Sequence, residues 1–320
     1  MDIKQKLYQM FILGTEGGGY EQALQKGLGG MIFFTKDIQN VEQFKGLVAK
    51  IKSLAAIPPF LSIDEEGGRV ERTENIHNGK KYLSARYAYA KGEDFLRSQT
   101  YNIARELKSY GLNLNFAPCI DVDTNPDNPI IGERAFSSDA NEVSKCEKIV
   151  SQVYRENGII PCVKHFPGHG DANADSHLTL PKIDLTLAEM EKVHIKPFAS
   201  AVKNKIEMIM IAHLDCTCFE SGMPTSLSKK AVKYLREKLG FNGVIISDDM
   251  IMKGVATFGQ QAACETAIRA GVNLFCYRNS TPDIIEMIEE IARKALSDNE
   301  LCENIEKSFD KINLLKQKFI

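Results

Sequence analysis

A short segment near the middle of the chain concentrates side chains that can transfer protons. It runs Lys-His-Phe-Pro-Gly-His-Gly over residues 164–170 and is followed by Asp175, Ser176 and His177, so it holds three of the six histidines of the chain. Pro and Gly prevent a helix here, and the loop of small residues that follows can carry Asp175 and His177 over a pocket. The composition is not that of a core segment and indicates an active site.

Asp175 and His177 have the spacing of a proton-transfer pair. They lie two residues apart on a loop that is not expected to be helical. In such a pair the carboxylate can bond one ring nitrogen, fix the tautomer and raise the basicity of the imidazole. The second ring nitrogen is then available to donate or accept a proton.

Metal binding is the main alternative for the histidines. His165 and His169 are four residues apart, as zinc ligands on a helical turn are, but the Phe-Pro-Gly sequence between them cannot form that turn. His213, Cys216 and Cys218 match no common zinc pattern. The sequence therefore predicts neither a metal nor another cofactor.

Composition limits the partners and the location. The chain has 320 residues, 43% of them hydrophobic, and a formal net charge of −2, which gives no bulk attraction to nucleic acid or to an anionic membrane. The apolar run at residues 10–13 is too short for a signal sequence, and no stretch could span a bilayer. Eight cysteines without a disulfide framework suit a reducing compartment. We expect a cytoplasmic protein that acts on a small molecule.

The elements that position these residues alternate regularly along the chain. Short apolar runs predict eight strands, which are Gln9–Leu13, Gly30–Phe34, Phe60–Ile63, Leu112–Ala117, Ile160–His165, Glu207–Ala212, Gly243–Ser247 and Val272–Tyr277. Between them lie amphipathic segments at Val41–Leu54, Asp94–Tyr110, Glu142–Asn157, Leu187–Lys203, Ser228–Leu239 and Gln260–Ala270, several of which end in glycine, as at Gly111, Gly158, Gly240 and Gly271.

Eight strand–helix units predict an α/β protein with a (β/α)8 TIM-type barrel. Two further helices, Pro282–Ser297 and Asn299–Lys318, would close it, and no linker or second domain is evident, so residues 1–320 are expected to form one catalytic barrel.

Polar residues gather where the predicted strands end, which is the face that carries function in barrels of this kind. Adjacent strand residues face opposite sides, and the pattern does not show which side faces inward. It therefore cannot choose between Asp248 and Asp249. The group consists of residues 64–69 (Asp-Glu-Glu-Gly-Gly-Arg), Asp121, Asp123, Lys164, His165, His213, Asp215, and Ser247, Asp248 and Asp249.

These motifs together resemble glycoside hydrolase family 3, and within it the bacterial β-N-acetylhexosaminidases. The resemblance rests on residues 164–170 with 175–177, on Asp-Glu-Glu-Gly-Gly-Arg-Val-Glu-Arg at 64–72, on Ile-Gly-Glu-Arg at 131–134 and on Gly-Val-Ile-Ile-Ser-Asp-Asp at 243–249. It extends from about Tyr8 to Lys318. Two departures are that Glu65 stands where many relatives have Gln, and that residues 75–82 lack the usual Leu-Pro step.

The resemblance implies specific roles. Asp248 would be the nucleophile, His177 the general acid/base and Asp175 its partner. The terminal sugar would be bound by Asp64, Arg72, Arg134, Lys164 and His165. Gly168 and Gly170 would let the loop that carries the pair move over bound substrate.

The activity that the resemblance implies is retaining, cofactor-free hydrolysis of a non-reducing terminal N-acetylglucosamine from cell-wall (muropeptide) fragments through a covalent glycosyl-enzyme. Two alternatives remain open. One is a metal-dependent amidohydrolase on the same barrel that uses His165, His169 and Asp248, and the other is a sugar-binding barrel without catalysis.

Overall fold

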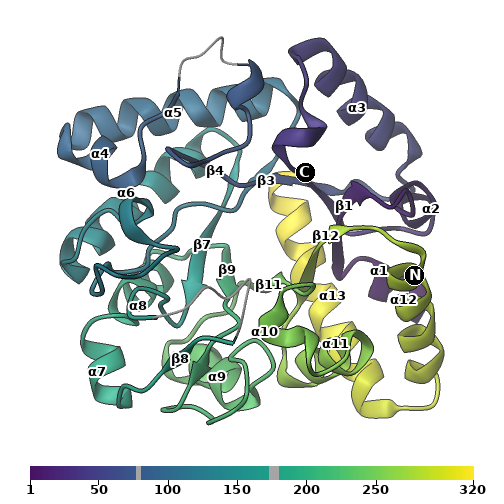
Figure 1. Cartoon of the computed structure of the whole chain (residues 1–320). Helices are drawn as coiled ribbons and strands as arrows, with labels where there is room; N and C mark the ends of the chain where they lie inside the picture. The colour runs from purple at the N-terminus through teal and green to yellow at the C-terminus, as the bar shows by residue number, and fades with distance from the viewer. Residues whose placement is uncertain (77–80, 173–179) are drawn as a thin grey trace.

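The computed structural model describes residues 1–76, 81–172 and 180–320. Its centre is a closed barrel of parallel strands in the order β1-β12-β11-β9-β7-β6-β3-β2, with helices around it (Figure 1). The strands are β1 (Phe11–Glu16), β2 (Gly30–Phe33), β3 (Phe60–Ile63), β6 (Leu114–Asn115), β7 (Ile160–Phe166), β9 (Met208–Ile211), β11 (Val244–Asp249) and β12 (Leu274–Asn279). The predicted (β/α)8 barrel is confirmed.

The outer layer consists mainly of helices that follow the strands. They are α1 (Ile3–Tyr8), α2 (Tyr20–Gln25), α3 (Val41–Leu54), α4 (Ala85–Ala90), α5 (Glu93–Ser109), α6 (Ala140–Glu156), α7 (Leu187–Lys192), α8 (Lys196–Lys203), α9 (Lys229–Lys233), α10 (Lys253–Ala256), α11 (Gln260–Ala270), α12 (Pro282–Ala295) and α13 (Asn299–Phe319). The two short antiparallel strands β4 (Glu65–Gly67) and β5 (Val70–Glu71) form a hairpin directly after β3. A second pair, β8 (Lys182–Ile183) and β10 (Asp215–Cys216), lies outside the barrel.

The helix ends follow local sequence signals. The Asn40 side chain accepts the N–H of Gln43 at the start of α3, and Thr186 forms a capping box with Glu189 at the start of α7. Gly271 ends α11 in the left-handed conformation, with φ of 103°. Gly111, Gly158 and Gly240 also have positive φ. The predicted helix-terminating glycines are therefore confirmed.

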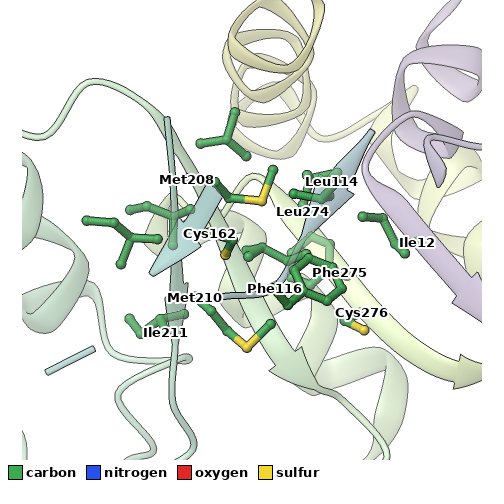
Figure 2. Close-up of a cluster of buried hydrophobic side chains, with 14 of the residues drawn as sticks. Ile12, Leu114, Phe116, Cys162, Met208, Met210, Ile211, Leu274, Phe275 and Cys276 are labelled. Carbon is green, nitrogen blue, oxygen red and sulfur yellow. The ribbon is translucent and has the colours of Figure 1, made fainter. Parts of the chain in front are cut away.

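The core fills the barrel itself and the layer between strands and helices. Inside the barrel, side chains from several strands meet, as Leu114 of β6, Cys162 of β7, Met208 of β9 and Leu274 of β12 do in Figure 2. Strands β2, β3 and β9 are buried along their whole length, which is expected of a parallel sheet covered on both faces. A rigid core of this kind fixes the strand ends, and with them the residues that follow.

Some predicted boundaries were wrong. The segment predicted as one helix over Leu187–Lys203 is α7 and α8, separated at residues 193–195, with Pro197 in the first turn of α8. Proline lacks the N–H that a continuous helix would need there. The helix predicted over Ser228–Leu239 is α9 followed by a π-helical turn at Tyr234–Lys238. Among the described residues, no helix combines the length and the apolar character needed to cross a membrane.

Candidate active site

A cavity of about 420 Å³ opens at the carboxyl ends of the barrel strands. A volume of this size falls within the range of small-ligand sites. Six of the eight residues to which the resemblance gives a role line it, namely Asp64, Arg72, Arg134, Lys164, His165 and Asp248. They come from the ends of different strands and from the loops that follow, so the barrel topology is what brings them together.

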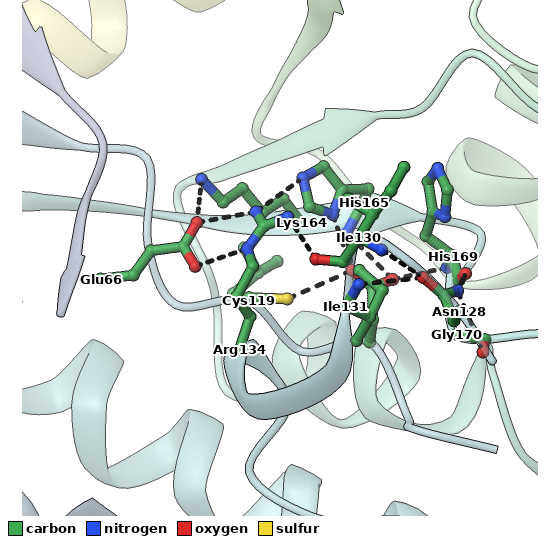
Figure 3. A network of polar contacts seen from close by, with 12 residues as sticks. Glu66, Cys119, Asn128, Ile130, Ile131, Arg134, Lys164, His165, His169 and Gly170 are labelled. Atoms are coloured by element: carbon green, nitrogen blue, oxygen red, sulfur yellow. Dashed lines mark hydrogen bonds and ion pairs between the residues drawn. The ribbon is translucent and has the colours of Figure 1, made fainter. Parts of the chain in front are cut away.

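A buried ionic network forms one wall of the cavity (Figure 3). Arg134 donates two hydrogen bonds to Glu66, of 2.9 and 2.8 Å. Lys164 Nζ lies 2.6 Å from Glu66 and 2.6 Å from Asp64. Burial alone would raise the pKa of Glu66, but Arg134 and Lys164 outweigh it and hold that pKa well below its usual range. The network therefore keeps its charges at neutral pH and presents them at fixed positions.

His165 is held in one tautomer by partners on both sides. Its Nδ1 lies 2.6 Å from Asp121 Oδ2, and its Nε2 lies 3.4 Å from Nη2 of Arg134. A guanidinium can only donate, so Nε2 accepts and the proton resides on Nδ1. Burial would raise the pKa of Asp121, but the neighbouring His165 and the N–H of His169 keep it well below its usual value. His165 thus faces the cavity as an oriented ring.

The loop after β7 is packed tightly where the structure describes it. Asn128 donates to the carbonyls of His169 (2.8 Å) and Gly170 (3.3 Å). A Cβ atom on Gly170 would lie 1.7 Å from the Val122 carbonyl oxygen, and one on Gly168 would lie 2.6 Å from the Cβ of His194. In this structure both glycines are needed for close approach between backbone segments, and their part in loop movement stays a prediction.

Asp248 and Asp249 both line the cavity although they are adjacent in the sequence. The register between β11 and β12 shifts between Ile246 and Asp249, so strand alternation does not separate them. Asp249 forms an ion pair with Arg278 and accepts the N–H of Ile251. Within the described residues, the Asp248 carboxylate accepts a single hydrogen bond, from the N–H of Asp249 at 2.8 Å. Among the described residues, the Asp248 carboxylate therefore makes fewer hydrogen bonds and ion pairs than that of Asp249.

The charge of Asp248 is stabilised by its surroundings. Burial would raise its pKa, but His165, His213 and the N–H of Asp249 outweigh this and hold the pKa below its ordinary value. His213 is itself fixed behind the site, since Nδ1 lies 2.7 Å from the Ser226 hydroxyl and Nε2 lies 3.2 Å from the Asp249 carbonyl oxygen. Asp248 is thus ionised at neutral pH and available as a nucleophile.

One group of described residues has the composition of a metal site. Ligand atoms of Cys119, Asp121 and His165 lie within 4.8 Å of one another. However, Asp121 already accepts hydrogen bonds from Cys119, from the His165 ring and from the N–H of His169. Burial also raises the pKa of Cys119 well above its usual value, so its thiol stays protonated. The arrangement satisfies the carboxylate with N–H and S–H donors and does not fit a cation.

Other residues singled out in the sequence are placed differently. Asp123 pairs with Arg86, and Asp215 accepts the N–H of Gly222, so both stabilise loops outside the cavity. Asp175 and His177 lie outside the described residues. His213, Cys216 and Cys218 form no cluster of possible metal ligands within residues 1–76, 81–172 and 180–320.

The sequence analysis did not single out Arg278, and it gave no individual role to Glu66 or Arg69, although both belong to the polar group that it identified. Glu66 anchors the ionic network, and Arg69 and Arg278 line the cavity. Glu66 is two residues from Asp64, a spacing that in an extended chain places both side chains on one face. Arg278 follows directly on the apolar run of the last strand, so its position at the strand end could have indicated its place at the rim.

Comparison with protein families gives a match over nearly the whole chain. A model described as the glycosyl hydrolase family 3 N-terminal domain matches residues 3–313. A β-hexosaminidase of Idiomarina loihiensis is 30% identical over 285 residues, which cover 87% of this chain and 85% of that protein. β-Hexosaminidase A of Pseudoalteromonas piscicida is 32% identical over 271 residues, which cover 77% of this chain and 45% of that protein.

A solved structure has the same fold over nearly the whole of this chain. A family 3 β-N-acetylglucosaminidase from Paenibacillus sp. str. FPU-7 superposes with a TM-score of 0.89 and 28% identity, covering 99% of this chain and 62% of that one. This chain therefore spans less than two thirds of the length of the Pseudoalteromonas and Paenibacillus proteins.

Proposed function

The chain belongs to glycosyl hydrolase family 3, and we propose that it is a β-N-acetylhexosaminidase that removes a non-reducing terminal N-acetylglucosamine. The observation that carries the proposal is the cavity itself. In it the ionised carboxylate of Asp248, which is in no ion pair with a lysine or arginine of the described residues, lies among the hydrogen-bonding groups of Arg134, Lys164 and His165. The names of the Idiomarina and Paenibacillus relatives support the choice of sugar.

In the proposed reaction Asp248 attacks the anomeric carbon of the bound sugar. The leaving oxygen takes a proton, and a covalent glycosyl-enzyme forms and is then hydrolysed, so that the anomeric configuration is retained. The position of Asp248 at the end of β11 favours this role, because the rigid barrel limits its movement. His165, His213 and the N–H of Asp249 keep the carboxylate ionised between turnovers.

The terminal sugar would be bound by Asp64, Arg72, Arg134, Lys164 and His165. Lys164 and Arg134 can donate charge-assisted hydrogen bonds to sugar hydroxyls while Glu66 holds them in place. Asp64 can accept hydrogen bonds from the same sugar. His165 adds a hydrogen-bonding edge whose orientation is set by Asp121 before the substrate arrives.

Proton transfer is assigned to Asp175 and His177 on the strength of the family resemblance alone. In this proposal Asp175 orients the imidazole, and His177 protonates the leaving oxygen and later activates water. A histidine then takes the part that a second carboxylic acid plays in most retaining glycosidases.

The finer assignment is that the substrates are muropeptide fragments of the cell wall, handled in the cytoplasm by a single catalytic barrel comprising residues 1–320. Eight cysteines with free thiols suit a reducing compartment. The charge balance of the chain suits a small glycoside rather than nucleic acid or a membrane surface.

The test is to compare a chromogenic N-acetyl-β-glucosaminide with the matching β-glucoside. We expect turnover of the N-acetylated compound, with kcat/KM at least about tenfold above that of the glucoside. The control is Asp248→Asn, which should be inactive on both compounds. Tight binding of N-acetylglucosamine without turnover by the unmodified protein would instead support the sugar-binding alternative.

Metal dependence distinguishes the remaining alternative. Because the candidate metal ligands already satisfy one another, we expect activity to survive dialysis against EDTA. Loss of turnover on chelation, with recovery on adding zinc, would favour the amidohydrolase.

A further inference from the structure

Strand β11 leaves the regular barrel pairing at the point where it carries Asp248. The register between β11 and β9 runs as far as Ser247 and Ile211. On the other side, the register between β11 and β12 shifts between Ile246 and Asp249. Asp248 and Asp249 are therefore not held by regular pairing on both sides, and other groups have to fix their position.

Asp249 is bound at each of its polar groups. Its N–H donates to the Asp248 carboxylate at 2.8 Å, and its own carboxylate pairs with Arg278. Its carbonyl oxygen accepts the N–H of Met252 at 2.9 Å and lies 3.2 Å from Nε2 of His213. The position of the Asp248 carboxylate thus depends on how Asp249 is held.

His213 contacts Asp249 through a defined ring nitrogen. A carbonyl oxygen can only accept, so Nε2 of His213 carries a proton and donates to Asp249. The ring is fully buried, and burial lowers its pKa, so it is neutral at pH 7 and its Nδ1 is an acceptor. The Ser226 hydroxyl, also fully buried, lies 2.7 Å from Nδ1 and therefore donates to it. Ser226 thus selects the tautomer that can bind Asp249.

Ser226 is itself held against the end of β9. Its N–H donates to the carbonyl of Ala212, the residue before His213, at 3.2 Å. The neighbouring Thr225 donates its hydroxyl to the same carbonyl at 2.7 Å. The segment before α9 and the end of β9 are therefore joined, and the His213 ring reaches from this support to the end of β11.

We propose that Ser226 and His213 are positioning residues, which hold Asp249 and through it set the point from which the Asp248 carboxylate attacks the sugar. The inference rests on the proposed function in taking Asp248 as the nucleophile. Neither Ser226 nor His213 lines the cavity, so both act on the reaction through Asp248 and not through the sugar. Their effect is on rate, because a displacement of about 1 Å in a reacting group can slow a reaction by about a hundredfold.

Hydrogen exchange tests this support without any need for turnover. The amide of Asp249 is followed in the wild type, in Ser226→Ala and in Thr225→Val. The amide of Ile245 in the same strand, which the Asn273 side chain binds, is the internal reference. Thr225→Val is the matched control, because it removes a buried hydroxyl that bonds a backbone carbonyl instead of a histidine.

We expect the Asp249 amide to exchange about tenfold faster in Ser226→Ala, relative to the Ile245 reference, because Asp249 loses part of its support. Thr225→Val should leave this ratio at the wild-type value. The same ratio in all three proteins would overturn the inference.

Kinetics then tests the link to the nucleophile. On an N-acetyl-β-glucosaminide, kcat should fall by about tenfold in Ser226→Ala and by about a hundredfold in His213→Leu. The inhibition constant of N-acetylglucosamine should change by less than about twofold, because other residues bind the sugar. His213→Gln, whose amide N–H can take the place of the Nε2 proton, should recover most of the activity that His213→Leu loses. Thr225→Val should keep the wild-type kcat.

Azide separates positioning of the nucleophile from general support of the site. In Asp248→Ala, added azide attacks the anomeric carbon in place of the carboxylate and gives the glycosyl azide. Combining Ser226→Ala with Asp248→Ala should leave the azide-dependent rate unchanged, because no carboxylate remains to be positioned. An equal loss of rate from Ser226→Ala with and without Asp248 would overturn the inference. A wild type that shows the exchange difference but turns over no N-acetylglucosaminide would contradict the proposed function and leave the support of Asp249 standing.

Discussion

Carboxylates at the rim of this barrel differ in their partners rather than in their type. Asp64 and Glu66 neutralise Lys164 and Arg134, Asp249 is paired with Arg278, and Asp248 is left facing the cavity with backbone and imidazole neighbours. Only a carboxylate that is ionised and not bound to a cation can attack an electrophilic carbon readily. The distribution of cations around the rim therefore supports the proposal that Asp248, among these acids, is the nucleophile.

Replacing the two adjacent aspartates should separate their roles. Asp248→Asn removes the nucleophile, and we expect kcat/KM to fall by at least about 10³-fold with an unchanged melting temperature. Asp249→Asn weakens the pairing with Arg278, so it should lower the melting temperature and reduce kcat/KM only about tenfold. Steady-state kinetics and thermal melts distinguish the two, and added azide should partly restore Asp248→Ala, in which the space of the carboxylate is vacant. The assignment of the nucleophile is wrong if Asp249→Asn is the inactive variant.

The proposed acid is tested by varying the leaving group. His177→Ala should slow cleavage of natural sugar–sugar bonds by roughly 10²- to 10⁴-fold, the usual contribution of general acid catalysis. An aryl glycoside with an acidic phenol needs no protonation, so its first step should be nearly unaffected in a pre-steady-state burst. Asp175→Ala should show a weaker form of the same pattern, because the imidazole remains but loses its orienting partner. Equal slowing for good and poor leaving groups would make His177 a binding residue.

Much of the candidate site followed from one rule, that residues after barrel strands converge. The rule predicted that Asp64, Lys164, His165 and Asp248 would share a cavity, as they do. It could not rank Asp248 above Asp249, because the register shift between Ile246 and Asp249 removes the alternation on which such a ranking depends. Nor could it reveal the pairing of Arg134 with Glu66, since a long-range contact leaves no local sequence signal.

At the scale of elements, the periodicity of apolar residues predicted the barrel strands but not the short β4–β5 hairpin that follows one of them. Each of the eight predicted strands is present, because a strand buried on both faces must be continuously apolar. The β4–β5 hairpin was not predicted, since residues 65–71 are rich in charge and glycine and lack strand alternation. The hairpin is held instead by Glu65, whose side chain accepts the N–H of Arg72, and by Asn115, whose side chain donates to the Glu65 carbonyl oxygen.

Two glycine substitutions compare a packed loop with a helix interior. Gly170→Ala places a methyl group against the Val122 carbonyl, so it should displace the loop after β7 and lower the free energy of unfolding by about 1–3 kcal/mol. Gly46 lies on the exposed face of α3, where an added Cβ would meet no atom outside its own helix backbone within 4 Å, so Gly46→Ala should raise that free energy by about 0.5–1 kcal/mol. Urea unfolding measures both. A stable Gly170→Ala with unchanged kcat/KM would show that the loop tolerates movement at this point.

At the scale of the whole molecule, the barrel has a functional end and a structural end. The charged cavity occupies the carboxyl ends of the strands, while α13 packs against α1 and places Lys316 among residues of the opposite end. Lys316 is 7% exposed, donates to Gln9 Oε1 (2.8 Å) and to the Pro58 carbonyl (2.9 Å), and lies over the Phe60 ring. Neutral acceptors satisfy its N–H groups but do not neutralise its charge, and burial lowers its pKa to about 7.

This lysine makes the stability of the fold depend on pH in a predictable direction. The folded protein releases the Lys316 proton near pH 7, whereas the unfolded chain keeps it up to the ordinary pKa of 10.5, so the unfolded state binds more protons between these values. Stability should therefore rise with pH across that range. Lys316→Met removes the titrating group, and we expect the free energy of unfolding of the wild type, relative to this variant, to increase by on the order of 1–3 kcal/mol between about pH 7 and pH 9. Lys307→Met, on the exposed face of the same helix, serves as the matched control and should parallel the wild type. Urea unfolding at each pH gives the three curves, and parallel curves for wild type and Lys316→Met would mean that Lys316 keeps its charge in the folded barrel.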